Sequence, residues 1–458
     1  MNVQALFPSS RDRETILETL IVLAELEQDE PVRAGLATLH PADIAELLNV
    51  LEEPEVKQKV FSFLDPDLAS EVLSLVSART RAELTEELSS VILGDLVERL
   101  DSDDAADLLA SLPEAQARAV LDQVPQELSA EMAQLLRYPA DTAGGIMQTE
   151  HVAVPQGTRV EQAIEIIRSH IDEVSDIHNL LVVDQARHLV GVLPLRKLIL
   201  ARPNELIENL MDRQVISVRV DLDQEQVAQL FKRYDLVSLP VVDADGVLLG
   251  RITVDDVVDV LEEEASEDIY RLAGLGGEET VLDAPGRSMR RRLPWLGLNL
   301  VTTTLSASVI SFFEGTIQAV AIAAAFMTIV AAQGGNAGIQ TLTVIVRGLA
   351  LGEVSLSHVR KVLLNELLIA LGNGIALGAA AGLVAYFWKG EPLLGAVLTL
   401  ALVVNLLVAA FVGSMIPFTM RWLGIDPAIA SNVFVTACTD ICGFLSFLGI
   451  LTLSLQFF

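Results

Sequence analysis

Five long stretches without a charged residue constrain this chain more than any other feature of its sequence. Each exceeds the roughly 20 residues that an α-helix needs to cross about 30 Å of hydrocarbon. They are residues 293–313, 316–346, 367–388, 392–420 and, apart from Asp440, 427–458. The sequence therefore predicts an α-helical bundle of five transmembrane helices in residues 293–458.

Charge is distributed unevenly between this region and the rest of the chain. The 458 residues include 62 acidic and 31 basic ones, and 51% are hydrophobic. Only six acids and five bases lie in residues 293–458, so residues 1–292 carry 56 acids, 26 bases and a net charge of −30. A surface this acidic repels nucleic acid and attracts cations. We expect an acidic soluble half, with no nucleic-acid partner, followed by a nearly neutral half in the lipid bilayer.

Basic residues between the predicted spans indicate the orientation in the membrane. They precede the first span and follow the second and fourth spans: Arg287, Arg290, Arg291, Arg292, Arg347, Arg360, Lys361 and Arg421. The opposite loops hold only Glu314, Lys389 and Glu391. The positive-inside rule therefore places residues 1–292 in the cytoplasm, and five spans place the C-terminus on the opposite side.

Residues 1–137 show several short helical patterns rather than one long pattern. Apolar residues recur at a spacing of three to four, and turn residues interrupt the run. The helical segments begin near Ala42, Asp67, Gly94 and Asp103, and Pro66 and Pro113 are among the turn residues. Helices this short cannot each bury a core, so we expect a stacked, all-α superhelical domain.

Two similar units follow, in residues 138–204 and 205–264. Each shows a short strand, an amphipathic helix, two β-branched strands joined by a turn, and a closing helix. This internal repeat resembles a tandem CBS (Bateman) module, which has an α/β fold. A helical stretch in residues 265–292 then links the module to the spans.

CBS pairs often bind adenine nucleotides through a Thr and an Asp three residues later, after the last strand. Thr253 and Asp256 fit this pattern in the second unit, whereas Pro194 and Lys197 occupy the equivalent places in the first. The resemblance therefore leaves ATP binding open at one site.

Asp440 is the one charged residue within the last predicted span. An ionised carboxylate in hydrocarbon costs at least a few kcal/mol, so something must compensate it. Asn432, Thr436, Asp440 and Phe444 recur every four residues and share one helix face. Two interpretations are open: the carboxylate binds a cation, or it is buried between helices, protonated or bonded to a hydroxyl such as that of Thr439.

Two cysteines flank Asp440, at positions 438 and 442. Their thiols could hold a soft metal ion. None of the six histidines lies within an uncharged span. Thiols buried in a membrane usually fill space, so packing is the favoured interpretation of Cys438 and Cys442.

The order of these regions resembles that of the MgtE family of Mg²⁺ channels over essentially the whole chain. The most specific motifs are YPADTAG at residues 138–144, QGGNAGIQ at 333–340 and DPAIASNVFVTACTDICGF at 426–444. The resemblance implies a homodimer in a bacterial inner membrane, with a pore on the two-fold axis that the second and fifth spans line.

Residue by residue, the resemblance makes Asp440 the selectivity carboxylate of the pore, with Asn432 and Thr436 below it. The family commonly has Ala where this chain has Thr436. Mg²⁺ dehydrates reluctantly, so two Asp side chains around a hydrated ion suit its chemistry. Gly335 and Asn336 are expected to contribute from the second span, where the glycines permit either close helix contact or a break that exposes carbonyl oxygens.

The resemblance also assigns a regulatory role to acidic residues of the soluble half. Mg²⁺ ions would bridge acids of the linking helix, the helical domain and the second CBS unit. The matching positions are Asp256, Asp259, Glu264, Glu267 and Asp268, then Asp103 and Asp107, then Asp223, Glu225 and Asp235. Lys232 stands near the last group, where the family usually has Ala.

Together these features predict a Mg²⁺-selective channel that takes up Mg²⁺ passively and closes when cytosolic Mg²⁺ binds the acidic domains. Three alternatives remain: a membrane-anchored CBS sensor that conducts nothing, a carrier of another solute such as an anion, and a transporter of another divalent cation such as Co²⁺. An enzyme is not expected, because the sequence has no Walker motif, nucleophile elbow or HExxH motif.

Overall fold

The computed structural model describes residues 13–26, 28–170, 177–275, 279, 281, 285–429 and 432–457. The chain forms two compact units, residues 1–261 and residues 262–458. We refer to them as the first unit and the membrane unit and describe each by itself. The boundary falls within one helix, α14 (Val254–Leu272).

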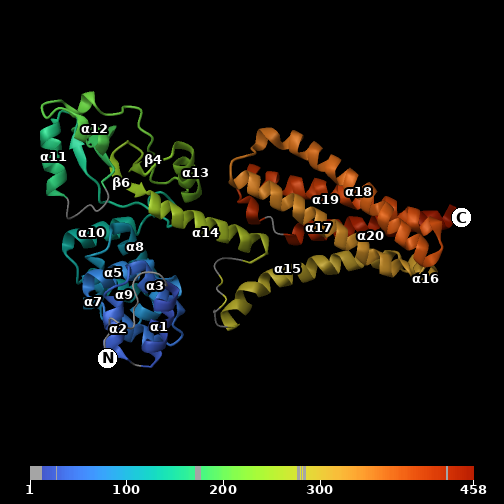
Figure 1. The fold of residues 1–458 in the computed structure, drawn as a ribbon. Coiled ribbons are helices and arrows are strands. Elements are labelled where there is room, and N and C mark those ends of the chain that lie inside the picture. Colours follow the sequence, from blue (N-terminus) through green and yellow to red (C-terminus); the bar gives the residue numbers. More distant parts are fainter. Residues whose placement is uncertain are drawn as a thin grey trace. The chain divides into compact units, whose positions relative to one another are not determined.

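The first unit begins with ten short helices (blue in Figure 1). They are α1 (Arg13–Glu25), α2 (Asp29–Leu36), α3 (Pro41–Val50), α4 (Pro54–Phe61), α5 (Pro66–Leu75), α6 (Ala78–Thr85), α7 (Ser90–Val97), α8 (Ser102–Ser111), α9 (Glu114–Leu121) and α10 (Gln126–Leu135). From α3 onward most helices pack on the next but one, so that α3, α5, α7 and α9 form one row, while α4 contacts α6 and α8 contacts α10; α1 packs chiefly on α2 and also contacts α3. This arrangement confirms the predicted superhelical domain.

Turn and capping residues keep these helices short. The Asp65 side chain accepts a hydrogen bond of 3.0 Å from the Leu68 backbone N–H, and Pro66 occupies the first helical position of α5. Proline has no N–H to lose there, and its fixed φ suits a helix start. Pro41 and Pro54 begin α3 and α4 in the same way. A proline therefore starts a new helix at intervals of about 12 residues in this part of the chain.

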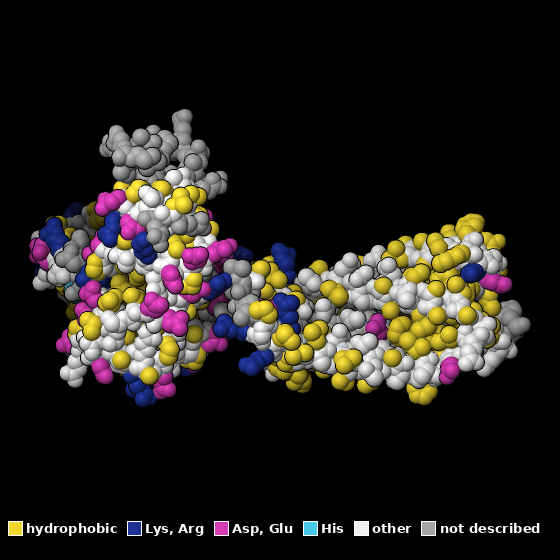
Figure 2. Space-filling model, turned by 90° about the horizontal axis from the view of Figure 1, so that it is seen from below, with side chains coloured by type: hydrophobic (Ala, Val, Ile, Leu, Met, Phe, Trp, Pro, Cys, Tyr) yellow, Lys and Arg dark blue, Asp and Glu magenta, His cyan; other side chains and the backbone are white. Residues whose placement is uncertain are grey.

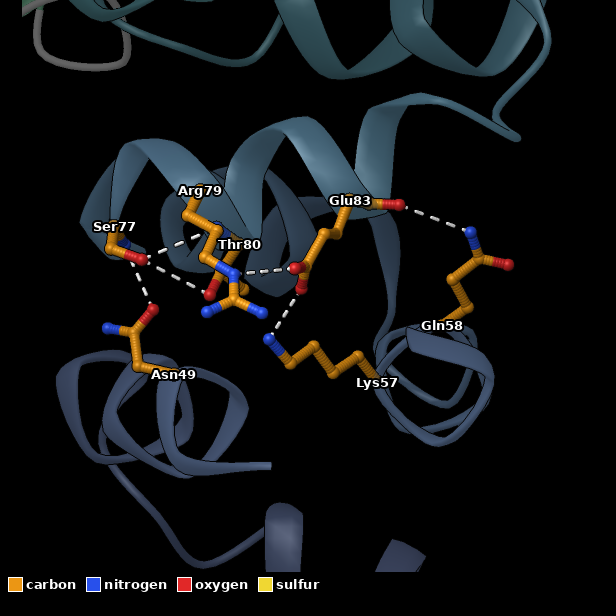
Figure 3. Close-up of polar contacts among 7 residues, drawn as sticks. All are labelled: Asn49, Lys57, Gln58, Ser77, Arg79, Thr80 and Glu83. Atoms are coloured by element: carbon orange, nitrogen blue, oxygen red, sulfur yellow. Dashed lines mark hydrogen bonds and ion pairs between the residues drawn. The ribbon is translucent and has the colours of Figure 1, made fainter. Parts of the chain in front are cut away.

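Polar contacts join α3, α4 and α6 (Figure 3). Lys57, which is only 2% exposed, donates to Glu83 Oε2 at 2.6 Å. Arg79 donates to the other carboxylate oxygen at 2.8 Å. Burial acts to raise the pKa of Glu83, but the hydrogen bonds from Lys57 and Arg79 outweigh it and lower the pKa. Asn49 completes the link by accepting a hydrogen bond of 3.0 Å from the Ser77 N–H.

The tandem module that follows has the predicted repeat of elements. The first half contains β1 (Ala153–Pro155), α11 (Val160–Ser169), β2 (Asn179–Val183), β3 (Leu189–Pro194) and α12 (Leu195–Leu200). The second contains η2 (Ile207–Asn209), β4 (Val218–Arg219), α13 (Gln224–Tyr234), β5 (Ser238–Val242), β6 (Leu248–Thr253) and α14. The sheets have the orders β1-β2-β3 and β4-β5-β6, each with one parallel and one antiparallel pair. The α/β expectation is confirmed.

The helical domain and the second half of the module share one hydrophobic core. Its buried members run from Leu17 to Met132 in the helices and include Val227, Phe231 and Ile252 in the module. The first half of the module has a separate core around Val154, Leu180 and Leu193. The helical domain is therefore packed against the half of the module that carries Thr253 and Asp256.

Within the described residues of the membrane unit, five helices are long and apolar enough to cross a bilayer. They are α15 (Pro285–Phe312), α17 (Ala323–Ala350), α18 (Val359–Lys389) with the preceding η3 (Leu356–His358), α19 (Pro392–Trp422) and α20 (Asn432–Phe457); α16 (Glu314–Ala319) and η4 (Pro427–Ile429) are short. Helices α17, α18, α19 and α20 form the bundle, and α15 contacts α20 (Figure 1). Figure 2 shows hydrophobic side chains (yellow) over much of the surface of these helices. This confirms the predicted five-helix membrane domain.

Glycines let α18 and α19 approach closely. A Cβ atom on Gly378 would lie 2.9 Å from the Thr399 carbonyl oxygen, and one on Gly382 would lie 2.6 Å from the Gly395 carbonyl oxygen. The Thr399 hydroxyl donates across the gap to the Gly378 carbonyl oxygen at 2.9 Å. Small residues that allow backbones to touch are a common means of helix association in membranes.

We expect Lys57→Ala to destabilise the first unit by about 1.5–3 kcal/mol, because the Glu83 carboxylate loses its buried charged partner and keeps only the more exposed Arg79. Urea-dependent proteolysis of the purified protein measures this loss. The loss should shrink as the pH falls below 4.5, the ordinary pKa of Glu83, since a protonated Glu83 no longer needs a charged partner. Lys59→Ala is the matched control on the same helix: its pair with Asp29 is exposed, so the change should cost under about 1 kcal/mol. Equal losses in the two variants would contradict this account.

We expect Gly382→Val to destabilise the membrane unit by about 1–3 kcal/mol, because the added methyl groups force α18 away from α19. All three tryptophans lie in the membrane unit, so the thermal change in their fluorescence reports its unfolding. Gly372 lies on the same helix with open space around it. Gly372→Val should therefore leave the transition unchanged, and a similar loss there would show that helix propensity, not packing, is responsible.

Candidate ion pathway and acidic regulatory sites

Two adjacent columns of residues run along α20, and they differ in burial. Val435, Thr439, Gly443 and Phe447 form a buried column at a spacing of four residues. Asn432, Thr436, Asp440 and Phe444, the predicted pore face, form a half-buried column one residue away. One residue corresponds to about 100° around a helix. The first column therefore packs inside the bundle, and the column of Asp440 lies at its edge.

In the part of its own chain that the structure describes, Asp440 has no polar partner. Among the described residues, none donates a hydrogen bond to its carboxylate or forms an ion pair with it. The hydroxyl of Thr439, which the sequence suggested as a partner, instead donates to the Thr436 carbonyl oxygen at 3.0 Å. The half-buried carboxylate thus lacks the internal compensation that an intramembrane charge needs.

The second span, α17, is one continuous helix through the QGGNAGIQ motif. The glycines therefore serve close contact and do not break the helix. A Cβ atom on Gly335 would lie 3.8 Å from Thr436 Cγ2, and Gly338 lies against Val435. Asn336 and Gln340 are exposed in the single chain. The motif brings α17 beside the column that contains Asp440.

Two acids that the sequence singled out, Asp103 and Asp256, meet inside the first unit. Asp103 lies in the first turn of α8 and Asp256 in the first turn of α14. Gln148 donates a hydrogen bond to Asp103, and Asp103 and Asp256 share a hydrogen bond, but the buried Asp103 Oδ1 has no partner. Burial first, and then the charges of Asp256 and Asp104, raise the pKa of Asp103 to about 9. Burial likewise raises the pKa of Asp256 to about 6.

Neighbouring acids of α8 have a basic partner. Burial raises the pKa of Asp104 to about 6, and the positive charge of Arg81 opposes this rise. Asp107 is exposed one turn later and also lies near Arg81. At the start of α8, the Ser102 hydroxyl donates to Glu150 Oε2 at 2.7 Å and ties the helix to the module. The acidic face of α8 is therefore held in place, and Asp103 is the carboxyl on it with an unpartnered buried oxygen.

The candidate nucleotide pair, Thr253 and Asp256, forms a helix cap in this structure. Asp256 Oδ2 accepts hydrogen bonds from the Thr253 hydroxyl at 2.6 Å and from the Thr253 N–H at 3.1 Å. This contact satisfies a backbone donor at the start of α14, as in a capping box. In the first half of the module, Lys197 instead pairs with Asp212 at 2.6 Å. The Thr–Asp spacing therefore has a structural cause that is independent of any nucleotide.

The acids of the second half of the module lie at opposite ends of α13. Asp223 caps its N-terminus and accepts a hydrogen bond of 3.0 Å from the Glu225 N–H. Asp235 ends the helix in a left-handed conformation, with φ of 49°. The helix has 11 residues, so about 16 Å separates its two ends. One ion cannot bind both Asp223 and Asp235 within a single chain.

The last turns of α14 carry acids around one arginine in the membrane unit. Arg271 forms ion pairs with Glu267, on its own helix, and with Asp426, in the loop before α20. Burial, and then Asp426 and Glu264, raise the pKa of Asp268 to about 6, against the effect of Arg271. Leu272 packs beside Ala428 and Val435. The end of α14 thus contacts the segment that leads into the span of Asp440.

Among the described ranges, no three His, Cys, Asp or Glu side chains lie close enough together to hold a metal ion. Asp259 is exposed on α14, and Glu264 is half-buried. Gln148 and Arg271 contact the predicted acids, although no sequence motif singled them out. Arg271 is the basic residue four positions after Glu267, so an i, i+4 search would have found that pair but not its link to Asp426.

Three family models match the chain. The model described as "MgtE intracellular N domain" covers residues 39–141, the CBS domain model covers 143–204 and 207–263, and the model described as "Divalent cation transporter" covers 327–450.

Curated relatives match most of the chain. Magnesium transporter MgtE of Thermus thermophilus is 38% identical over 340 residues, which is 73% of this chain and 75% of the relative. Magnesium transporter MgtE of Enterococcus faecalis is 38% identical over 332 residues, 72% of this chain and 73% of the relative.

Two solved structures resemble the N-terminal part. The soluble part of a magnesium transporter is 31% identical and covers 55% of this chain and 99% of its own, with a TM-score of 0.50. The cytosolic domain of the Mg²⁺ channel MgtE in complex with ATP is 37% identical and covers 53% of this chain and 99% of its own, also with a TM-score of 0.50. With the order of regions, the motifs and these matches in agreement, the chain belongs to the MgtE family, whose membrane domain is described as a divalent cation transporter.

Proposed function

We propose that this protein conducts Mg²⁺ passively across the membrane, and that Mg²⁺ bound to its acidic domains closes it. The observation that carries the proposal is the Asp440 carboxylate, which is half-buried on a membrane span and has no partner among the residues that the structure describes. The curated relatives named magnesium transporters support the choice of ion. The solved relative described as a cytosolic domain supports a cytosolic location for the first unit.

The chemistry of Asp440 suits Mg²⁺ as the transported ion. Mg²⁺ keeps most of its water and is usually bound through one or two carboxylates. In a homodimer with its pore on the two-fold axis, two copies of α20 present two Asp440 side chains to one another. Their repulsion is relieved by a dication between them. Asn432 and Thr436 lie in the same column and offer neutral oxygen atoms to the water around the ion.

Helix α17 supplies the rest of the pore wall in this proposal. Gly335 lies beside Thr436, and Asn336 follows on the exposed side of α17 in the single chain. An exposed amide next to the column of Asp440 suits a helix that faces a water-filled path in the dimer. We therefore assign Gly335 to packing beside the pore and Asn336 to its lining.

Regulation is assigned first to Asp103 and Asp256. These carboxyls come from different domains, share one proton or one cation, and leave Asp103 Oδ1 buried without a partner. A Mg²⁺ ion with water in its remaining positions satisfies that oxygen and neutralises the pair. Without it, repulsion favours separation of α8 from α14. The ion thus stabilises one conformation more than the other, as a ligand-driven switch requires.

A second regulatory contact is assigned to the end of α14. Glu264, Glu267 and Asp268 on α14, together with Asp426 before α20, surround Arg271. Mg²⁺ at these acids adds to the charge of Arg271 and holds α14 against the loop that leads to Asp440. Asp259 of α14 and Asp223, Glu225 and Asp235 of the module bind Mg²⁺ only with partners from another chain or another conformation.

ATP binding at the module and a non-conducting sensor are two further interpretations of this chain. The ATP-bound relative supports an ATP site at the module, where Thr253 and Asp256 are the candidates. Nucleotide binding there would have to share Asp256 with the helix cap and with Asp103. A non-conducting sensor is the alternative function, and it predicts that the purified protein carries no Mg²⁺ current.

We expect Asp440→Asn to lower the initial rate of Mg²⁺ entry into proteoliposomes by about tenfold or more. The amide keeps the shape of the side chain but removes the charge that compensates the ion, and a charged hydrogen bond is worth about 1.5–3 kcal/mol. A Mg²⁺-sensitive dye inside the vesicles measures entry at a fixed membrane potential. Glu391→Gln, an acid in an exposed loop, is the control and should leave the rate unchanged. Full activity of Asp440→Asn would make this residue structural, and no entry with the native protein would favour the sensor.

We expect Asp103→Asn to reduce the stabilisation of the first unit by Mg²⁺. Because the pKa values of Asp103 and Asp256 are raised in the folded state, that state binds more protons than the unfolded chain between pH 3.8 and about 9. In EDTA the free energy of unfolding should therefore fall as the pH rises through this window, and millimolar Mg²⁺ should restore it.

In the variant both the pH dependence and the Mg²⁺ effect should become smaller, as measured by urea-dependent proteolysis of the full-length protein. Glu114→Gln replaces an exposed acid of the same domain and should behave as the native protein. The assignment fails if Asp103→Asn is stabilised by Mg²⁺ as much as the native protein.

A further inference from the structure

Helix α19 carries an amide side chain, Asn405, near its middle, in a span that has no charged residue between Pro392 and Met420. The side chain is fully buried, with 0% of its surface exposed. A polar group at this depth has no water to bond, so its contacts with neighbouring helices decide whether it is tolerated.

Asn405 fills the space between three helices. Its Nδ2 donates to the Val330 carbonyl oxygen of α17 at 2.9 Å. A Cβ atom on Gly334 of α17 would lie 2.9 Å from Asn405 Cγ, and one on Gly443 of α20 would lie 2.8 Å from Nδ2. The absence of a side chain at both glycines makes room for the amide. The Asn405 side chain of α19 therefore lies between α17 and α20 and sets the distance between them.

This spacer lies at the level of the candidate ion site. Gly443 follows Asp440 by three residues, or about 4.5 Å along α20. It belongs to the buried column of α20, which is one residue from the column of Asp440. Gly334 precedes Gly335 and Asn336 on α17. A change in the size or bonding of Asn405 therefore shifts or rotates both pore helices beside the carboxylate.

We propose that Asn405 is a positioning residue for ion selection: its amide sets the separation of α17 and α20 and the direction in which Asp440 faces. This inference rests on the proposed function, in which α17 and α20 line the pore. The second observation in its favour is the buried Asn405 Oδ1, which has no hydrogen-bond partner. A leucine, which branches at the same atom but is bulkier, would avoid that unpaired acceptor, but it could not bond the Val330 carbonyl oxygen and would press on Gly334 and Gly443.

The principal variant is Asn405→Leu, and the control is Ser414→Ala. Ser414 lies on the same helix, is fully buried and also has an unpartnered oxygen, but among the described glycines none has Ser414 as a nearest neighbour. The first measurement compares Mg²⁺ and Co²⁺ entry into proteoliposomes over a range of concentrations. Because a shift of about 1 Å in a binding geometry can change a rate by about a hundredfold, we expect the Mg²⁺-to-Co²⁺ ratio to fall by about tenfold in Asn405→Leu. Ser414→Ala should keep the native ratio.

A size-exchange pair keeps the inference testable if Asn405→Leu fails to fold. Gly443→Ala adds a methyl group that meets the Asn405 amide and should lower Mg²⁺ entry. The smaller side chain of Asn405→Ser makes room for that methyl group, so the double variant should recover part of the loss. Independent, additive losses would overturn the assigned contact.

The orientation of α20 can be measured without any transport. Cys438 and Cys442 are the only cysteines of the chain and flank Asp440 on α20. In full-length protein with one of them changed to Ser, the rate of maleimide labelling reports how the other faces. Asn405→Leu should change the ratio of the two rates, and Ser414→Ala should not.

Each combination of results decides the question. Unchanged labelling rates overturn the inference, whatever the transport result. Changed labelling with native Mg²⁺ and Co²⁺ entry confines Asn405 to bundle packing and also overturns it. If the native protein carries neither ion, the proposed function fails, and with it the role of Asn405 in selection.

Discussion

A carboxylate between apolar helices needs compensation, and the membrane unit is organised around how Asp440 obtains it. Val435, Thr439 and Gly443 take up the packed side of α20 and leave the column of Asp440 half-buried at the edge of the bundle. No group of its own chain neutralises the charge in the described part of the structure. The charge must therefore be compensated by an ion, by water or by a second copy of the chain. Ionisable residues inside a membrane typically mark ion pathways, and that interpretation explains Asp440 most simply.

The first unit presents the same electrostatic problem in a different setting. Asp103 and Asp256 are brought together by domains that share a hydrophobic core, so apolar packing is opposed by repulsion between carboxylates. The balance depends on whether a proton or a cation is present. Arg271 shows the internal solution to a similar problem, since one guanidinium pairs with Glu267 and Asp426. The Arg271 site carries its own cation, so its stability depends little on external ions. Among the described residues, the Asp103 and Asp256 pair has no such cation, so its stability depends on external ions, and this dependence suits sensing.

Local patterns predicted most of the architecture. An uncharged stretch of about 20 residues predicts a membrane-spanning helix, because few soluble structures could bury it. In the helical domain, prolines mark the positions at which several helices begin. The Thr253 and Asp256 pair was predicted from the resemblance to CBS modules and the spacing of their nucleotide motif, and that spacing cannot distinguish a helix cap from a ligand site. The glycines of QGGNAGIQ are compatible with close helix contact and with a helix break, because glycine permits both. The structure shows close contact, since residues of α19 and α20 pack against these glycines.

The sequence by itself determined the order of the regions, the number of spans, the acidic character of the first 292 residues and the position of one carboxylate inside the last span, because each of these follows from composition or short-range periodicity. Only the tertiary structure decided which acids meet, which acids are caps, and which buried amide spaces the two helices beside Asp440. These contacts join residues far apart in the chain, such as Asn405 with Val330 and Asp103 with Asp256. Their distances depend on how whole helices pack, and no local pattern records that packing.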